Sequence, residues 1–164
     1  MVPILPVRIG KAMSTLQYAD INRDTPTIFL DIDGVCHRNL NESLERIPLL
    51  ESFLTTHHCQ IVISSTWTET CNEAYLASAL GEIVWSCVVG FTPKLPFCEG
   101  VYHRQSEVET FAGYFGLKYF IALDDDRDEF GHDAKVHFTN KKTGLVRGDI
   151  QKLINWYYKQ FELL

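Results

Sequence analysis

The sequence has no apolar run of the roughly 18 residues that a transmembrane helix needs. Near the start of the chain, Pro3, Pro6 and Arg8 interrupt the apolar stretch before it reaches the length of a secretory signal. We therefore expect a soluble, cytoplasmic protein with no membrane partner.

The five cysteines are odd in number and include no C-x-x-C pair. Such a set fits neither a disulfide framework nor a zinc ribbon, so we expect reduced thiols. Positive charge is also scarce, with 15 Lys and Arg against 21 Asp and Glu and a net charge of -6. Because indiscriminate affinity for nucleic acid comes from many Lys and Arg contacts to phosphates, this balance argues against it, although a local basic groove remains compatible.

Five short apolar runs alternate with helical stretches along the chain from residue 27 onward. This alternation predicts an α/β fold in which helices cover a central parallel sheet. The expected strands are residues 27–30, 60–64, 82–89, 119–123 and 135–139, and the expected helices are about residues 48–54, 68–81, 105–115 and 149–161. The length suits a single domain, which we place at residues 26–164 behind an N-terminal extension of residues 1–25.

Polar clusters follow three of the expected strands. Asp31 and Asp33 come after the first strand, residues 64–66 (Ser-Ser-Thr) after the second, and the run DDDRD at 124–128 after the strand YFIAL. Ligands of open parallel sheets bind beyond the carboxyl ends of the strands. The three clusters are therefore predicted to meet at one edge of the sheet.

Two like charges one residue apart, as in Asp31-x-Asp33, repel each other unless a cation lies between them. Mg²⁺ takes oxygen ligands, commonly one or two carboxylates together with phosphate oxygens and water. We therefore expect Mg²⁺ to bind Asp31, Asp33 and acids of the 124–128 run.

Around such a metal the residues suit phosphoryl transfer. Asp31 can attack phosphorus and form an aspartyl-phosphate, and Asp33 can protonate the leaving oxygen and later activate water. Gly34 permits a tight loop whose backbone N–H groups point at phosphate oxygens. The remaining phosphate charge would be held by the hydroxyls of Ser65 and Thr66 and by a cation, Arg104 or Lys94.

The motifs FLDIDGV, IVISST and FIALDDDRD resemble the first, second and fourth motifs of the haloacid dehalogenase (HAD) superfamily of phosphohydrolases. In finer detail, LDIDGV, IVISSTW, GFTP, R-x-x-E-V-E, IALDDD and the late TGL are similar to the small HAD domain of multifunctional "Swiss Army Knife" RNA repair proteins. The resemblance covers about residues 27–157 and implies a three-layer, Rossmann-like HAD fold.

The resemblance also implies a role for each matching residue. Asp31 is implied as the nucleophile, Asp33 as the general acid and base, and Ser65 as the phosphate-binding hydroxyl, with Ser64 one step away. Arg104 fits the basic third position, with Lys94 as the competing candidate. The magnesium site would be completed by Asp124 and Asp125, with Asp128 as the alternative second acid.

The segments from Asp31 to Ser65 and from Ser65 to Arg104 are too short for a sizeable cap domain. In this superfamily an uncapped site often accompanies a large substrate. We therefore expect a Mg²⁺-dependent phosphoric monoester hydrolase whose substrate is a phosphorylated macromolecule such as a nucleic acid end. The alternatives are a phosphatase of phosphoproteins or nucleotides, and a low-turnover HAD-like module for binding or regulation.

Overall fold

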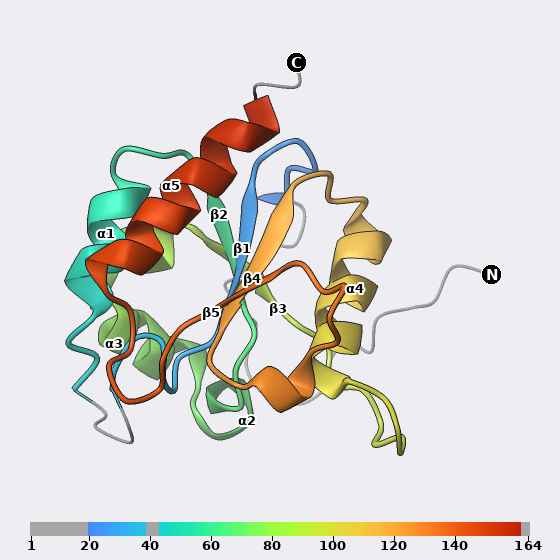
Figure 1. Ribbon diagram of the computed structural model, residues 1–164. Coiled ribbons are helices and arrows are strands. Elements are labelled where there is room, and N and C mark those ends of the chain that lie inside the picture. The colour runs from blue at the N-terminus through green and yellow to red at the C-terminus, as the bar shows by residue number, and fades with distance from the viewer. Residues whose placement is uncertain (1–19, 39–42, 162–164) are drawn as a thin grey trace.

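The computed structural model describes residues 20–38 and 43–161, and its centre is a sheet of five parallel strands in the order β3-β2-β1-β4-β5 (Figure 1). The strands are β1 (Thr27–Leu30), β2 (Gln60–Ile63), β3 (Val88–Phe91), β4 (Phe120–Asp124) and β5 (Val136–Phe138). The helices are α1 (Ile47–Leu54), α2 (Trp67–Thr70), α3 (Glu73–Ser86), α4 (His103–Phe115), the 3-10 helix η2 (Arg127–Glu129) and α5 (Arg147–Phe161).

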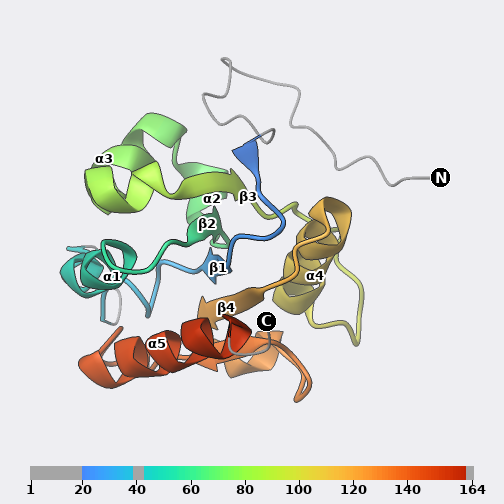
Figure 2. The ribbon, with the colours of Figure 1, turned by 90° about the horizontal axis from the view of Figure 1, so that it is seen from above.

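Helices cover both faces of the sheet, which makes three layers (Figure 2). Successive strand residues point to opposite faces, so Ile28 and Leu30 pack with α1, α3 and α5 while Phe29 packs with Phe111 of α4. Burial on both faces explains why the strands read as continuous apolar runs. The predicted three-layer α/β fold with a central parallel sheet is confirmed.

The strand order reverses beside β1. The chain runs outward from β1 to β2 and β3, and then crosses back so that β4 pairs with the other side of β1. In open α/β sheets this switch point opens the crevice where ligands bind, at the carboxyl ends of the strands. Leu30 pairs with Leu123 in register, so the residues that follow, Asp31 and Asp124, leave the two central strands side by side.

The strand predicted at residues 82–89 is wrong, because most of that segment belongs to α3 and the strand is β3 at Val88–Phe91. Leu76, Leu80 and Val84 recur every four residues and are all buried, so they form the apolar stripe of a helix. A helix from Thr68 to Gly81 is also wrong: Asn72 caps α3, and helical geometry breaks at Gly81 (φ 80) before the helix resumes to Ser86.

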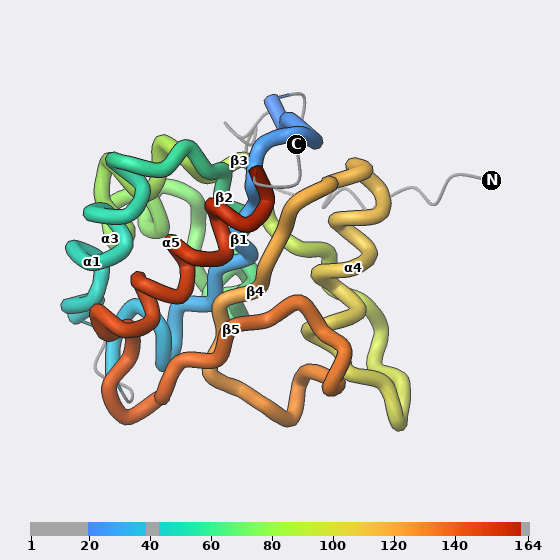
Figure 3. The backbone as a smooth tube through the Cα atoms, turned by 45° about the horizontal axis from the view of Figure 1, so that its top comes forward, coloured from blue at the N-terminus to red at the C-terminus, as the bar shows by residue number. Residues whose placement is uncertain are grey.

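Among the described residues, the connections from β1 to β2 and from β2 to α4 carry no cap domain. In Figure 1 the connection from β3 to α4, residues 92–102, projects from the same end of the molecule as α2, and in Figure 3 it extends as a loop beyond α4. Over the same described ranges, no helix combines the length and the apolar character that a membrane crossing requires.

Residues 1–19 of the predicted N-terminal extension lie outside the described residues. The part that is described is tied to the sheet, because the backbone N–H and carbonyl of Asn22 both hydrogen-bond the side-chain amide of Gln60, at 3.1 and 2.8 Å.

Candidate active site

Three carboxylates gather at the carboxyl ends of β1 and β4. Asp31, Asp124 and Asp125 each offer an oxygen atom, and these three atoms all lie within 4.8 Å of one another. Asp31 and Asp124 are buried, with 6% and 3% of their surface exposed. The backbone fixes their proximity, since the N–H of Asp31 donates to the carbonyl of Leu123 at 3.0 Å.

This grouping is electrostatically costly without a cation. Burial, and then the neighbouring charge of Asp124, raises the pKa of Asp31 to about 8. Burial raises the pKa of Asp124 to about 6, and also raises the pKa of Asp125. The positive charge of Arg104 lowers the pKa of Asp31 and of Asp124, but it does not cancel the rise in either. A set of converging carboxylate oxygens with uncompensated charge fits a hard divalent cation such as Mg²⁺.

Gly34 makes room for this group. Its φ of +70 lies in the left-handed region, and a Cβ at this position would lie 2.3 Å from Oδ2 of Asp125. The buried hydroxyl of Thr139, just beyond β5, donates to the carbonyl of Gly34 at 2.8 Å. The turn after β1 is therefore held directly against the acids that follow β4.

Asp33, which was predicted to share the metal, lies outside the group of three. Its Oδ1 lies 2.7 Å from Nε2 of His37 and accepts a hydrogen bond from the indole N–H of Trp67 at 3.0 Å. Its side chain keeps 39% exposure. The turn at Gly34 separates the two aspartates of the motif, so one faces the buried acids and the other faces these two rings.

Sequence reasoning missed His37 and Trp67 as partners of Asp33. A histidine four residues after Asp33 in a tight loop was the available signal for the first contact. Nothing in the sequence indicates the second contact, because it joins the β1 loop to α2 across the sheet edge.

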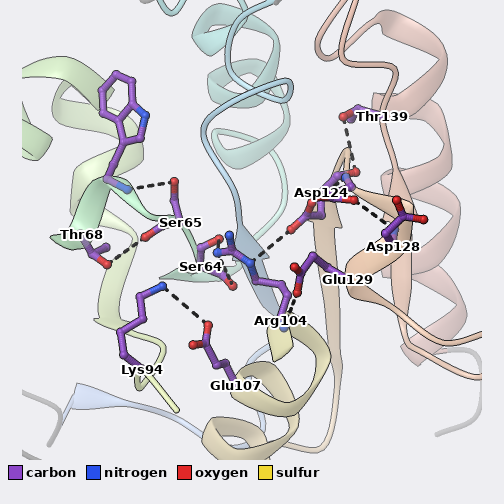
Figure 4. Close-up of polar contacts among 12 residues, drawn as sticks. Ser64, Ser65, Thr68, Lys94, Arg104, Glu107, Asp124, Asp128, Glu129 and Thr139 are labelled. Carbon is purple, nitrogen blue, oxygen red and sulfur yellow. Dashed lines mark hydrogen bonds and ion pairs between the residues drawn. The ribbon is translucent and has the colours of Figure 1, made fainter. Parts of the chain in front are cut away.

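Arg104 lies between Ser64 and Asp124, with Ser65 next to Ser64 at the end of β2 (Figure 4). Nε of Arg104 is 3.8 Å from Oδ2 of Asp124, and its guanidinium donates to the carbonyl of Ser64. The hydroxyl of buried Ser65 hydrogen-bonds Asp31 and lowers its pKa against the effect of burial. The structure thus brings Asp31, Ser65 and Arg104 together, while Thr66 is exposed as the cap residue of α2.

Of the two candidate cations, Lys94 is held by other acids. Its Nζ lies 3.3 Å from Glu69 and 3.7 Å from the buried Glu107 (Figure 4). Arg104, in contrast, contacts Asp124 of the acidic group. This geometry favours Arg104, not Lys94, as the basic residue beside the acidic group.

The geometry also separates Asp125 from Asp128. Asp125 belongs to the group of three acids, whereas Asp128 is exposed in η2 and its N–H donates to Oδ1 of Asp126 at 3.0 Å. The structure therefore favours Asp125 as the second acid after β4.

A pocket of about 410 Å³ opens beside Arg104. It is lined by Thr66, Glu69, Lys94, Leu95, His103, Arg104, Glu107 and Glu129. Next to it, the β3–α4 connection exposes Phe97, whose ring stacks on His103 at 5.2 Å between centroids. The pocket adjoins the serines and Arg104, so a group attached to a bound phosphate could extend into it.

Comparison with known proteins agrees with this arrangement. No curated protein and no solved structure matches the chain significantly. A family model described as "HAD domain in Swiss Army Knife RNA repair proteins" matches residues 27–150, which is most of the chain and spans β1 to the start of α5. The chain therefore belongs to this family of HAD domains, within a superfamily of phosphohydrolases.

Proposed function

We propose that this protein is a Mg²⁺-dependent phosphatase that hydrolyses phosphate monoesters through an aspartyl-phosphate. The observation that carries the proposal is the position of Asp31, which is buried against two further acids and within reach of Ser65 and Arg104. A carboxylate in such surroundings has both a place for a metal and donors for a phosphate.

Each residue has its own role in the proposed reaction. An oxygen of Asp31 forms a bond to phosphorus as the bond to the leaving oxygen breaks, and Asp33 gives its proton to that oxygen. Asp33 then takes a proton from water as the water oxygen attacks phosphorus, which frees Asp31 and inorganic phosphate. Ser65 and Arg104 donate to the phosphate oxygens, where negative charge develops.

The donors that would hold Mg²⁺ are the carboxylates of Asp31, Asp124 and Asp125. When bound, the ion supplies positive charge that offsets the repulsion among these acids and the phosphate. The side chain of Asp33 is left for proton transfer, since its contacts are His37 and Trp67.

The open pocket favours a large substrate. It lies beside Arg104 and, in the described part of the chain, no cap domain closes over it. A phosphorylated nucleic acid end is the substrate that we propose first, on the basis of the family match. Cytoplasmic location stays a prediction.

A substrate panel tests the function. The purified protein is assayed with a 3′- and a 5′-phosphorylated oligonucleotide, a phosphotyrosine peptide and mononucleotides, first with Mg²⁺ and then with a chelator. We expect hydrolysis of the oligonucleotide to require Mg²⁺, to stop with the chelator and to return when Mg²⁺ is added in excess. Preference for the peptide or the mononucleotides would change the substrate class, and no hydrolysis at all would favour a binding or regulatory module.

Gly34→Ala is expected to lower turnover by roughly ten- to a hundredfold. A Cβ at position 34 must push the Asp125 carboxylate out of the acidic group, and side-chain displacements of this size cost activity on that scale. The measurement is kcat and the Mg²⁺ concentration for half-maximal rate, which should rise.

Gly100→Ala is the matched control for that substitution. Gly100 also has a positive φ, at +76, but no atom lies within 4 Å of the place that an added Cβ would occupy. Both substitutions introduce the same kind of backbone strain, so only the contact with Asp125 distinguishes them. Equal losses in the two variants would show that strain, not displacement of Asp125, causes the effect.

A further inference from the structure

Both contacts of Asp33 fall on one oxygen. His37 and Trp67 each approach Oδ1, at 2.7 and 3.0 Å, and Oδ2 makes no hydrogen bond with the described residues. The side chain is 39% exposed, so the second oxygen can be reached from the site. The two oxygens of this carboxylate therefore have different surroundings.

The burial of His37 determines which way its hydrogen bond runs. The side chain is fully buried, and its Nδ1 has no hydrogen-bond partner in the described part of the chain. Buried N–H groups without an acceptor are rarer in proteins than buried acceptors without a donor, which indicates that an unpaired N–H at Nδ1 is the less favourable of the two arrangements. This favours the tautomer whose Nε2 carries the proton and donates to Oδ1 of Asp33.

The backbone around His37 holds the imidazole in place. The N–H of Leu145 donates to the carbonyl of Val35 at 2.8 Å, and the N–H of Arg46 donates to the carbonyl of Cys36 at 2.9 Å. Gly144 packs so closely that an added Cβ would lie 3.0 Å from the carbonyl of His37. The loop that carries His37 is therefore fixed from two sides.

Trp67 approaches Oδ1 from α2. Its ring centroid lies 6.2 Å from that of His37, so the two rings pack beside each other. The backbone N–H of Trp67 lies 3.4 Å from the hydroxyl of Ser65, which connects this indole to the phosphate-binding serine. Two elements distant in the sequence thus converge on the same oxygen.

We propose that His37 and Trp67 are positioning residues that hold Oδ1 of Asp33 and leave Oδ2 as the atom that transfers the proton. This inference rests on the proposed phosphatase function. As the bond between phosphorus and the leaving oxygen breaks, Oδ2 gives its proton to that oxygen. In the second step Oδ2 takes a proton from the attacking water, so protons balance over the cycle.

Two phosphate esters with different leaving groups test the inference. A 4-nitrophenolate leaves without help, whereas an alkoxide such as that of glycerol needs a proton as it departs, so in the first step only the second ester depends strongly on Asp33. The second step, attack of water on the aspartyl-phosphate, is the same for both esters. The first step is therefore measured alone, as the rate at which the alcohol is released in a single turnover. We expect Trp67→Phe and His37→Leu to lower this rate for glycerol phosphate by about ten- to a hundredfold, and for 4-nitrophenyl phosphate by less than about threefold, since general acid catalysis contributes on the order of a hundredfold or more.

Three variants make the result specific. Asp33→Asn should show the same selective loss with a larger magnitude. His37→Gln, which can still donate an N–H, should recover part of the loss seen in His37→Leu. Trp85→Phe is the matched control, because Trp85 is also a partly buried indole packed on the core but makes no contact with Asp33. Thermal unfolding of each variant establishes that it is folded.

Equal losses of the first-step rate on the two esters, or no loss on either in a folded Trp67→Phe protein, would overturn the positioning role. Trp67→Phe alone decides the matter if His37→Leu does not fold, because it removes the N–H and keeps a ring. Failure of the unaltered protein to hydrolyse either ester with Mg²⁺ would instead overturn the proposed function, and the assignment with it.

Discussion

Asp31→Asn is expected to lower turnover by roughly four orders of magnitude or more, the scale seen when a covalent nucleophile is removed. The amide cannot form the bond to phosphorus that the proposed mechanism assigns to the carboxylate, and Asp31 is the carboxylate to which the hydroxyl of Ser65 is hydrogen-bonded. The measurement is kcat with Mg²⁺ on the ester that the substrate panel selects, together with trapping of phosphate on the chain.

The same substitution is expected to stabilise the metal-free protein. Burial raises the pKa of Asp31 to about 8, above its ordinary value of 3.8, so the native state resists ionisation of this group. A raised pKa of this kind favours the folded state at low pH and disfavours it as pH rises toward 8. Asn carries no charge, and we expect Tm in chelator at pH 8 to rise by a few degrees, on the scale of about 1 kcal/mol.

Asp128→Asn is the control for both halves of this prediction. Asp128 is an exposed acid in η2, outside the group of three, so its substitution should change neither turnover nor Tm in chelator. Turnover of Asp31→Asn near that of the unaltered protein would contradict the covalent mechanism. A lower Tm in chelator would contradict the electrostatic account of the buried acids.

The sequence predicted the parts of the site that depend on strand order. Asp31 and Asp124 each follow a buried apolar run, and a parallel sheet brings the ends of neighbouring runs together without reference to side-chain detail. The family resemblance is confirmed by the match over residues 27–150. Residues 82–89 were predicted as a strand although most of them belong to α3, because the periodicity of a short apolar run does not distinguish a strand from a buried helix.

Side-chain directions were beyond sequence reasoning. Asp33 and Asp31 are one residue apart, yet one contacts His37 and Trp67 and the other contacts the acids after β4. The choice between Arg104 and Lys94 as the basic residue of the site likewise depended on which acids each side chain contacts. These directions follow from the turn at Gly34 and from packing between elements, and neither leaves a periodic pattern in the chain.

The affinity of the acidic group for Mg²⁺ is expected to rise with pH, by more than about a hundredfold between pH 5.5 and pH 8, since each unit of pKa is a factor of ten. The metal binds ionised carboxylates. Burial raises the pKa of Asp31 to about 8 and that of Asp124 to about 6, so at pH 5.5 Mg²⁺ must displace protons from both. Above pH 8 both groups are ionised and the gain should level off.

The stability of the metal-free protein should depend on the ionisation of the same two groups, but it should fall as pH rises. In the unfolded chain these acids ionise near 3.8, so the metal-free fold loses stability as pH rises above 3.8. The loss ends for Asp124 at about pH 6 and for Asp31 at about pH 8, where each group ionises in the folded protein as well. Mg²⁺ binds only the folded site and should therefore raise Tm more at pH 8 than at pH 5.5. Calorimetric titration with Mg²⁺ and thermal unfolding, at matched ionic strength across this range, measure the two effects.

Asp31→Asn provides the internal comparison for this pH dependence. It removes the group with the higher pKa, so the pH dependence of any residual Mg²⁺ affinity should move to lower pH, toward the range around pH 6 where Asp124 titrates. The number of protons released when Mg²⁺ binds should be smaller in this variant, because each released proton comes from a carboxyl group that becomes a metal ligand. A Mg²⁺ affinity of the unaltered protein that stays constant from pH 5.5 to pH 8 would show that these carboxyls are not its ligands.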